Sequence, residues 1–317
     1  MTDVDVMLVA EVLGVPVHRL YMLSSDRMPR NKRGGSYSNY HKSVIYSGRS
    51  KKKRVLTVPN GFLKTVQRRI LHRCLYKLPV SEYATAYCKG RGPADNASPH
   101  TGKDYIIKLD ISDFFGSIND DAVYMVMKQL KLTPRATSLL THLCVHNGVL
   151  PQGAPTSPYL ANLVMKHFDG RIGSWCAERN ISYTRYSDDM TFSGRRGDLL
   201  ASGLTGRVRN MLYSMGFELN SKKTVFAVCS QRQTVTGAVV NEKVNVPSEL
   251  RRKLRQEVYY CTRFGVEDHL ARCGSGEAPK AYISGLLGRL SYALQLRPDD
   301  EWLRSGFEKI KAMSNDI

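Results

Sequence analysis

The chain has 317 residues, and its 47 Lys and Arg against 28 Asp and Glu give a formal net charge of +19. At roughly 150 residues per domain this length predicts about two structural units, and the 42% hydrophobic content excludes a largely disordered chain. No run approaches the ~18–20 uninterrupted apolar residues of a membrane span, and residues 1–5 lack the basic segment of a secretory signal. Seven cysteines without a CxxC pair argue against a zinc ribbon. We therefore expect a cytoplasmic protein with no membrane partner.

The N-terminal part combines short helices with a strongly basic segment. Apolar residues at helical spacing over 4–23 indicate one or two helices, broken near Gly14 and Pro16. Residues 27–54 then carry ten Lys or Arg and no Asp or Glu, with interleaved tyrosines and with glycines and serines that favour a loop. A phosphodiester backbone is the commonest large source of counter-charge for such a segment, so we expect a nucleic-acid partner. A solvated basic loop is the alternative.

Hydrophobic periodicity predicts strands and helices in alternation over the middle of the chain. The predicted strands cover 55–58, 105–111, 225–228, 234–240 and 244–246, and the predicted helices cover 61–78, 120–130, 134–146 and 208–215, with turns over 90–103. Ser157 as N-cap and Pro158 as the first helical residue begin another helix, which should run to about Arg179. Two β-rich runs, 181–186 and 190–192, flank an acidic pair and so predict a hairpin with acid at its tip.

Beyond Pro247 the pattern is all-helical, which marks a domain boundary near residue 246. The predicted helices cover about 248–263, 279–296 and 299–313. The first of them carries a second basic run, which we expect to contact RNA: Arg251, Arg252, Lys253 and Arg255. The apolar positions of the same helix are equally those of an ordinary core-facing helix.

Three carboxylates stand beside predicted buried strands. Asp110 ends the run 105–111, and the pair Asp188 and Asp189 lies between two β-rich runs. Carboxylates in such a setting repel one another and lose solvation, and a divalent cation relieves both penalties. Mg²⁺ favours sites with few carboxylates plus substrate phosphates, and three carboxylates can hold two ions for in-line phosphoryl transfer. An acidic pair in a plain surface turn is the alternative.

Four segments resemble motifs A to D of reverse transcriptases in order and spacing. They are LDISDFF at 109–115, PQGAPTSP at 151–158, YSDD at 186–189 and GFELNSKKT at 216–224. Two further segments resemble the NAxxH and VTG signatures of bacterial retron reverse transcriptases, namely NASPH at 96–100 and VTG at 235–237. The resemblance covers roughly residues 50 to 240, and one departure is Ser187, where retron enzymes usually carry alanine.

The resemblance implies an α+β right-hand polymerase fold. Residues 1–104 would form N-terminal helices and fingers, and 105–246 a palm with an antiparallel sheet backed by helices and an inserted fingers segment at about 131–157. Residues 247–317 would form a helical thumb. We expect no RNase H domain, so a host RNase H would remove the template RNA.

The resemblance also assigns roles around the carboxylates. Asp110, Asp188 and Asp189 would be the catalytic residues that hold two Mg²⁺ ions, with the Ile111 carbonyl as a further ligand. Phe115 would be the steric gate that excludes a 2′-hydroxyl, a plain core aromatic being the alternative.

Several more residues would bind the incoming deoxynucleotide. Gln152 and Gly153 would shape its pocket, since glycine allows close backbone approach. Arg54 would hold the triphosphate, whereas Lys52 and Lys53 either assist it or lie in a solvated loop. Lys223 would face the leaving pyrophosphate as a general acid, with Lys222 as the competing choice. All of these assignments rest on the resemblance.

Retron enzymes bind one structured non-coding RNA and begin DNA synthesis from the 2′-hydroxyl of a guanosine, which gives a branched RNA–DNA product. In this chain Asn96 and His100 would help to position that RNA, and a buried, satisfied histidine is the alternative. The resemblance further implies deoxynucleotide substrates and an accessory effector protein in antiphage defence. Other hypotheses are a different bacterial reverse transcriptase lineage and a catalytically silent RNA-binding scaffold.

Overall fold

The structure is a computed structural model that describes residues 3–25, 38–47 and 52–315. Much of the predicted basic loop, residues 27–37 and 48–51, therefore lies outside the described residues. Of the helices that are described, no single one is long and apolar enough to cross a membrane; α1 and α2 meet that test only as a pair bent by 89°.

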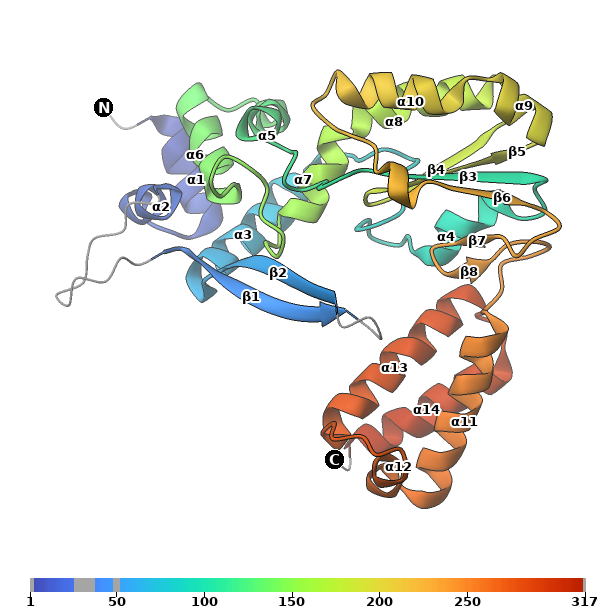
Figure 1. Cartoon of the computed structure of the whole chain (residues 1–317). Helices are drawn as coiled ribbons and strands as arrows, with labels where there is room; N and C mark the ends of the chain where they lie inside the picture. Colours follow the sequence, from blue (N-terminus) through green and yellow to red (C-terminus); the bar gives the residue numbers. More distant parts are fainter. Residues whose placement is uncertain (1–2, 26–37, 48–51, 316–317) are drawn as a thin grey trace.

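The fingers consist of helices and one β-hairpin (Figure 1). The helices α1 (Val4–Leu13) and α2 (Val17–Ser24) are separated at Gly14, whose φ of +61° ends α1, as predicted. They pack against α3 (Gly61–Arg73) and α6 (Pro134–Cys144). The remaining elements of this part are η1 (Leu75–Lys77), α5 (Asp120–Met127) and η3 (Lys128–Leu130).

The hairpin of the fingers corrects the prediction of a continuous loop. Strand β1 (Tyr40–Ser47) pairs antiparallel with β2 (Lys52–Pro59), so that Val44 lies opposite Val55. The predicted strand thus begins at Lys52 instead of residue 55, and its partner was not predicted. Most residues from 41 to 45 are exposed, so the segment lacks the apolar alternation that marks a half-buried strand.

The palm is a four-stranded antiparallel sheet in the order β4–β5–β3–β6, as the resemblance predicted. Its strands are β3 (Tyr105–Asp110), β4 (Ser182–Tyr186), β5 (Asp189–Gly194) and β6 (Val225–Val228). Helices α8 (Lys166–Ala177) and α10 (Leu204–Tyr213) lie along one face of the sheet (Figure 1). The other face carries α4 (Pro93–Ala97), η2 (Ser98–His100) and the hairpin of β7 (Thr234–Val235) and β8 (Ala238–Val239). The short α9 (Arg196–Ala201) and η4 (Ser221–Lys223) complete the palm.

Two predicted palm elements are broken in the structure. The helix expected from Ser157 to about Arg179 is divided at Met165 into α7 (Ser157–Val164) and α8, and the residue at its N-cap is Thr156. Ser157 instead donates its hydroxyl to the Pro151 carbonyl oxygen at 2.8 Å.

The strand expected over 234–240 is likewise folded back on itself. Thr236 and Gly237 both have positive φ, +48° and +84°, which is the backbone of a two-residue hairpin turn. The strand expected at 244–246 is reduced to one bridge between Val239 and Asn245.

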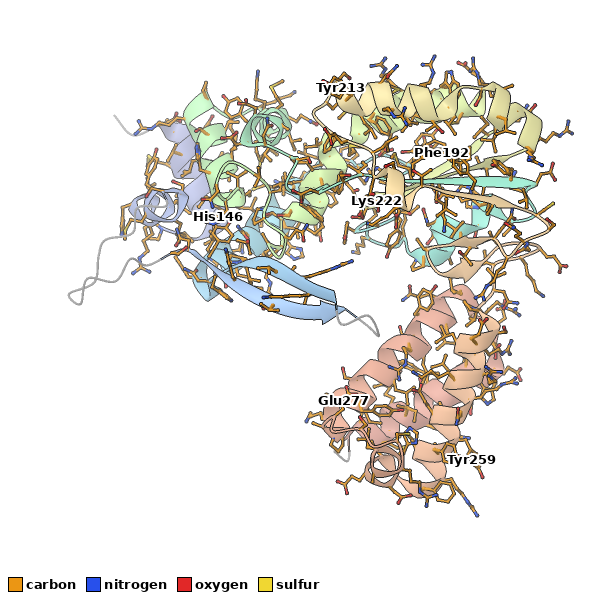
Figure 2. The ribbon with its side chains drawn as sticks, viewed as in Figure 1. His146, Phe192, Tyr213, Lys222, Tyr259 and Glu277 are labelled. Carbon is orange, nitrogen blue, oxygen red and sulfur yellow. The ribbon has the colours of Figure 1, made fainter. Side chains whose placement is uncertain are left out.

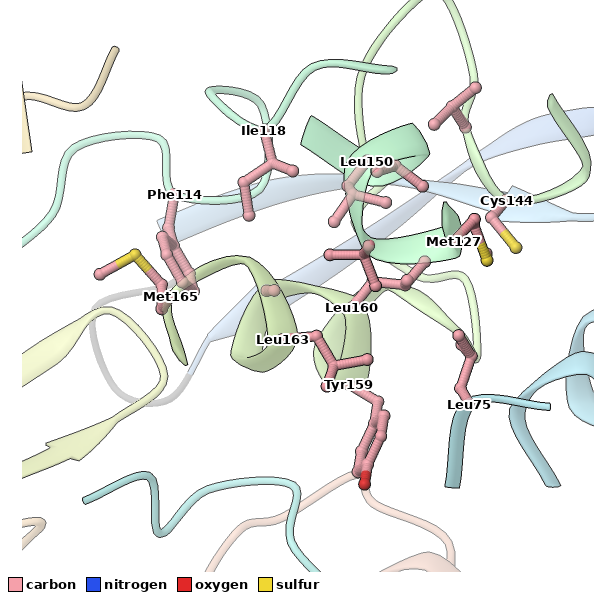
Figure 3. Close-up of a cluster of buried hydrophobic side chains, with 14 of the residues drawn as sticks. Leu75, Phe114, Ile118, Met127, Cys144, Leu150, Tyr159, Leu160, Leu163 and Met165 are labelled. Carbon is pink, nitrogen blue, oxygen red and sulfur yellow. The ribbon is translucent and has the colours of Figure 1, made fainter. Parts of the chain in front are cut away.

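The buried side chains form two clusters. The larger one joins fingers and palm, and Figure 3 shows part of it, where Phe114, Leu160 and Leu163 meet. The smaller one holds the thumb together and includes Ile106 and Val235 of the palm. The thumb helices are α11 (Ser248–Phe264), α12 (Val266–Arg272), α13 (Pro279–Leu296) and α14 (Glu301–Asn315). The buried cluster of the thumb therefore extends onto palm strands β3 and β7, before the predicted boundary.

Candidate active site

The register of the palm sheet brings the three predicted carboxylates together. Asp110 is the last residue of β3 and lies directly opposite Asp189, the first residue of β5. The amide of Ile111 donates to the carbonyl oxygen of Asp188 at 3.1 Å. Because antiparallel neighbours place opposite strand ends side by side, residues some 80 positions apart in the sequence share one edge of the sheet.

A buried arginine supports the turn that carries the carboxylate pair. Ser187 has a φ of +62°, and its carbonyl oxygen accepts a hydrogen bond from Arg185 at 2.9 Å. Arg185 is fully buried and makes a two-point ion pair with Asp169, at 2.8 and 2.7 Å, and a third bond to Asn162 at 3.0 Å. Sequence reasoning missed this support. The sequence did offer an indication of it, because Arg185 lies inside a predicted strand, and a charge that is buried there needs a partner.

The carboxylates are electrostatically strained. Partial burial of the carboxyl group, followed by the negative charges of Asp188 and Asp110, raises the pKa of Asp189 to about 6. Burial likewise raises the pKa of Asp188. The Asp110 side chain is only 5% exposed, and its Oδ2 accepts a hydrogen bond from Lys223 Nζ at 2.8 Å. That bond is the main cause that raises the pKa of Lys223. The structure thus brings Lys223 to the carboxylates; Figure 2 labels its exposed neighbour Lys222.

A cavity of about 730 Å³ opens beside this edge of the sheet. It brings together most of the predicted nucleotide-binding residues and two of the carboxylates: Arg54, Asp110, Ile111, Phe115, Gln152, Gly153, Asp188 and Lys223. Two cations of α3, Lys64 and Arg68, also line it and were not predicted. They stand four residues apart, on one face of a helix, which is the signal that was available.

Strand β2 of the fingers contacts the loop of the predicted nucleotide pocket through backbone atoms. The amide of Thr57 in β2 donates to the carbonyl oxygen of Gln152 at 2.8 Å. Gly153 has a φ of +123°, and a Cβ there would lie 3.0 Å from Val58 Cγ2 and 3.1 Å from the Thr57 carbonyl oxygen. Glycine is therefore needed for this approach of the strand to the loop.

The position of Phe115 agrees with both of its interpretations, a steric gate at the cavity and a core aromatic. Its ring is half-buried and packs 5.5 Å from that of Phe114, while the same residue lines the cavity. Lys53 is exposed on β2 and is not among the residues that line the cavity, and the side chain of Lys52 lies outside the described part.

The structure corrects the expected RNA contacts of Asn96 and His100. Both are buried, at 1% and 0% exposed. The two ring nitrogens of His100 lie 2.6 Å from Ser193 Oγ and 2.8 Å from Thr184 Oγ1. Burial, with a smaller effect from Lys103, lowers the pKa of His100 to about 3, so the ring is neutral. These residues match the alternative of a buried, satisfied histidine.

The basic run of the thumb is largely engaged within the thumb itself. Three of its members have partners there: Arg251 pairs with Asp300 at 2.5 Å, Lys253 with Glu257 at 3.5 Å, and Arg255 lies 5.5 Å from the Trp302 ring centroid. Arg252 is exposed, and no ion pair joins it to another described residue. Arg252 is accordingly the member best placed to meet an external phosphate.

The donor set at the carboxylates fits a divalent cation. Within residues 3–25, 38–47 and 52–315, no three His, Cys, Asp or Glu side chains are close enough to enclose a metal ion. Asp110 instead holds Lys223 with one oxygen, and its buried Oδ1 has no hydrogen-bond partner among the described residues. A bound cation would supply the missing partner of this oxygen, and oxygen ligands suit Mg²⁺.

An antiparallel palm sheet with carboxylates at one edge, a cavity beside them, fingers and a helical thumb together define a right-hand nucleic-acid polymerase. The family model described as "Reverse transcriptase (RNA-dependent DNA polymerase)" matches residues 40–253. The retron Ec86 reverse transcriptase of Escherichia coli is 33% identical over 235 residues, 72% of this chain and 72% of that protein. The retron Mx65 reverse transcriptase of Myxococcus xanthus is 33% identical over 313 residues, 92% of this chain and 68% of that protein.

Among solved structures, apo telomerase from Candida tropicalis shares the fold, with a TM-score of 0.52 at 12% identity over 92% of this chain and 59% of that chain. The chain belongs to the reverse transcriptase family and, within it, to the retron reverse transcriptases. Its class of activity is RNA-directed DNA polymerisation.

Proposed function

We propose that this retron reverse transcriptase copies part of a cognate structured non-coding RNA into DNA, starting from a guanosine 2′-hydroxyl. The product would be a branched RNA–DNA molecule, built from deoxynucleoside triphosphates. The observation that carries the proposal is the cavity in which segments like motifs A, B, C and D meet, on a chain whose relatives are named as retron enzymes.

The reaction joins the primer hydroxyl to the α-phosphorus of the deoxynucleotide, and the bond from that phosphorus to pyrophosphate breaks. Asp110, Asp188 and Asp189 would hold two Mg²⁺ ions, which supply charge neutralisation at the phosphates and lower the pKa of the attacking hydroxyl. Arg54, with Lys64 and Arg68, lines the same cavity as a set of cations for the triphosphate. A cluster of fixed cations stabilises the charge that develops on the leaving group.

Two side chains would refine this reaction. Lys223 is the cation that contacts Asp110, and we assign it the proton that passes to the leaving pyrophosphate. Phe115 would occupy the space beside C2′ of the sugar and so reject ribonucleotides, because its ring lines the cavity and is braced by Phe114.

The partners follow from the same proposal. They are the non-coding RNA as template and primer, its RNA–DNA product, a host RNase H that removes template RNA, and an effector protein in antiphage defence. Retention of all three carboxylates, of Phe115 and of Gln152 favours an active enzyme over a silent scaffold.

The test is to express the protein together with its flanking DNA, purify it, and extract the bound nucleic acid. We expect a discrete single-stranded DNA that shortens only after a debranching enzyme cuts the 2′–5′ linkage. The matched control is Asp189→Asn, which should bind the same RNA and yield no DNA. Bound RNA without DNA from the unaltered protein, with Mg²⁺ and all four deoxynucleotides supplied, would overturn the 2′-priming proposal.

A further inference from the structure

The two retron-like signature segments meet where the palm joins the thumb. NASPH forms the last two residues of α4 and the whole of η2, and VTG forms the end of β7 and the turn that leads to β8. Ala97 and Val235 belong to the same buried cluster as Leu290 and Ala293 of thumb helix α13. Figure 1 shows the palm end of α13 beside this hairpin. The signatures therefore face protein on both sides.

On the thumb side, the contact depends on one tyrosine and on the shape of the VTG turn. Tyr292 of α13 donates its hydroxyl to the Thr236 carbonyl oxygen at 2.8 Å. The Thr236 hydroxyl in turn donates to the carbonyl oxygen of Pro93, the first residue of α4, at 3.2 Å. A Cβ at Gly237 would lie 2.7 Å from the Tyr292 hydroxyl oxygen, so only glycine admits the tyrosine at this distance.

On the palm side, the contact continues from α4 to the catalytic turn. The Thr85 hydroxyl lies 2.9 Å from Asn96 Oδ1 and 3.0 Å from the Arg185 carbonyl oxygen. The Thr85 amide donates to that same carbonyl at 2.9 Å. Arg185 then donates from its guanidinium to the Ser187 carbonyl oxygen. These hydrogen bonds, linked through the backbone of α4 and through Arg185 itself, thus connect the thumb to the turn that carries Asp188.

Tyr292 and Thr236 are half-buried, whereas the polar atoms at the palm end of this path are buried, which makes the bonds of Thr85 and Asn96 the more costly to lose. Thr85 and Asn96 are 4% and 1% exposed. Asn96 Nδ2 has no partner among the described residues, and a hydroxyl has only one proton to give. With the oxygen and nitrogen of the Asn96 amide exchanged, Asn96 donates to Thr85 and Thr85 donates to the Arg185 carbonyl oxygen. Buried hydrogen bonds of this kind favour one geometry.

We propose that Tyr292, Thr236, Asn96 and Thr85 are positioning residues that fix the thumb and the catalytic turn relative to one another. None of them lines the catalytic cavity. A nucleic acid bound against the thumb then keeps a constant position relative to the carboxylates. The inference rests on polymerisation itself and is independent of the proposed 2′-priming.

The experiment is RNA-templated extension of an annealed DNA primer by one deoxynucleotide, measured over a range of template–primer concentrations. An ordinary 3′-hydroxyl primer keeps the result separate from 2′-priming. We expect Tyr292→Phe and Thr85→Val each to lower the ratio of maximal rate to half-saturating concentration about fivefold, the effect of about one hydrogen bond. The double variant should lose clearly less than the ~25-fold product, since both changes interrupt one path. Thr85→Ser, which keeps the hydroxyl, should restore the ratio.

The matched control is Tyr259→Phe, which removes a tyrosine hydroxyl from the outer end of α11, away from the palm (Figure 2). It should leave the ratio unchanged. All variants are assayed well below their melting temperatures, so that unfolding does not contribute. The proposal is overturned if the single variants keep the ratio of the unaltered protein, if the double variant loses the full product, or if Thr85→Ser is as poor as Thr85→Val.

Discussion

The catalytic cavity and the palm–thumb junction use polar residues in opposite ways. Around the cavity Arg54 and Lys223 are exposed, and partial burial together with like charges raises the pKa of Asp189. At the junction Asn96 and His100 are buried, and His100 is held neutral between two hydroxyl groups. The first arrangement leaves charged groups accessible to a substrate, whereas the second encloses polar groups within the protein.

The difference teaches how the two kinds of sequence motif should be interpreted. The segments that resemble motifs A to D line the cavity, where a substrate must enter. The two narrower signatures bury Asn96, Ala97, His100 and Val235 within the protein, where they pack between its parts. A signature that is specific to one family is therefore no evidence of ligand contact by itself.

The largest expected effect concerns the carboxylates. Asp189→Asn should lower DNA synthesis by about 10³-fold or more, because the residue acts with its neighbours as one catalytic unit. The folded protein should melt at the same temperature or higher, because the change removes one of three repelling charges at neutral pH. Primer extension and thermal melting measure the two effects. The control is Asp198→Asn, an exposed acid of α9. Activity near that of the unaltered protein would refute the catalytic role.

The next effect concerns the buried support of the catalytic turn. Arg185→Met should lower the free energy of unfolding by about 3–5 kcal/mol, because it leaves the Asp169 carboxylate buried and unpaired. Chemical denaturation measures this value. Arg232→Met, which breaks the exposed pair with Glu249, should cost about 1 kcal/mol or less. Equal losses in the two variants would show that the buried pair does not support the fold in this way.

Much of the candidate active site was predictable, because local pattern and sheet geometry act together there. Two β-rich runs around an acidic pair predict a hairpin, and antiparallel pairing then brings Asp110 to it. The partners of these residues were harder to predict. Lys64 and Arg68 are ordinary helix cations until α3 packs beside the cavity, and only the folded chain shows that Lys223 contacts Asp110.

The fold was predicted where burial imposes an apolar run and missed where it does not. The palm strands β3 and β4 are almost continuously buried, and they lie where the sequence predicts them. Strand β1 is not buried in this way, since both of its faces are largely exposed between Lys42 and Ile45. The turn at Thr236 and Gly237 was lost inside an apolar run because the residues on either side of it, Val235 and Ala238, are buried.

A smaller effect tests the selectivity of the cavity. Phe115→Ala should reduce the preference for deoxynucleotides over ribonucleotides by about tenfold to a hundredfold, since one steric contact is removed. Paired measurements of kcat/KM for a deoxynucleotide and its ribonucleotide give the ratio. Phe226→Ala, at an exposed position of β6, is the control and should keep the preference. An unchanged preference in Phe115→Ala would leave Phe115 as a core aromatic only.

The smallest expected effect concerns the pH dependence of stability that is linked to the buried His100. The folded-state pKa of His100 is about 3, so below its ordinary value of 6.5 the unfolded chain takes up a proton that the folded chain refuses. Stability linked to His100 is therefore complete above about pH 6.5 and is lost as the pH falls below it. His100→Gln should be less stable than the unaltered protein at pH 7. The gap in unfolding free energy should then narrow by about 1 kcal/mol at about pH 5.5. A gap that stays constant between these pH values would mean that the folded protein admits the proton, and that His100 is not sealed within the junction.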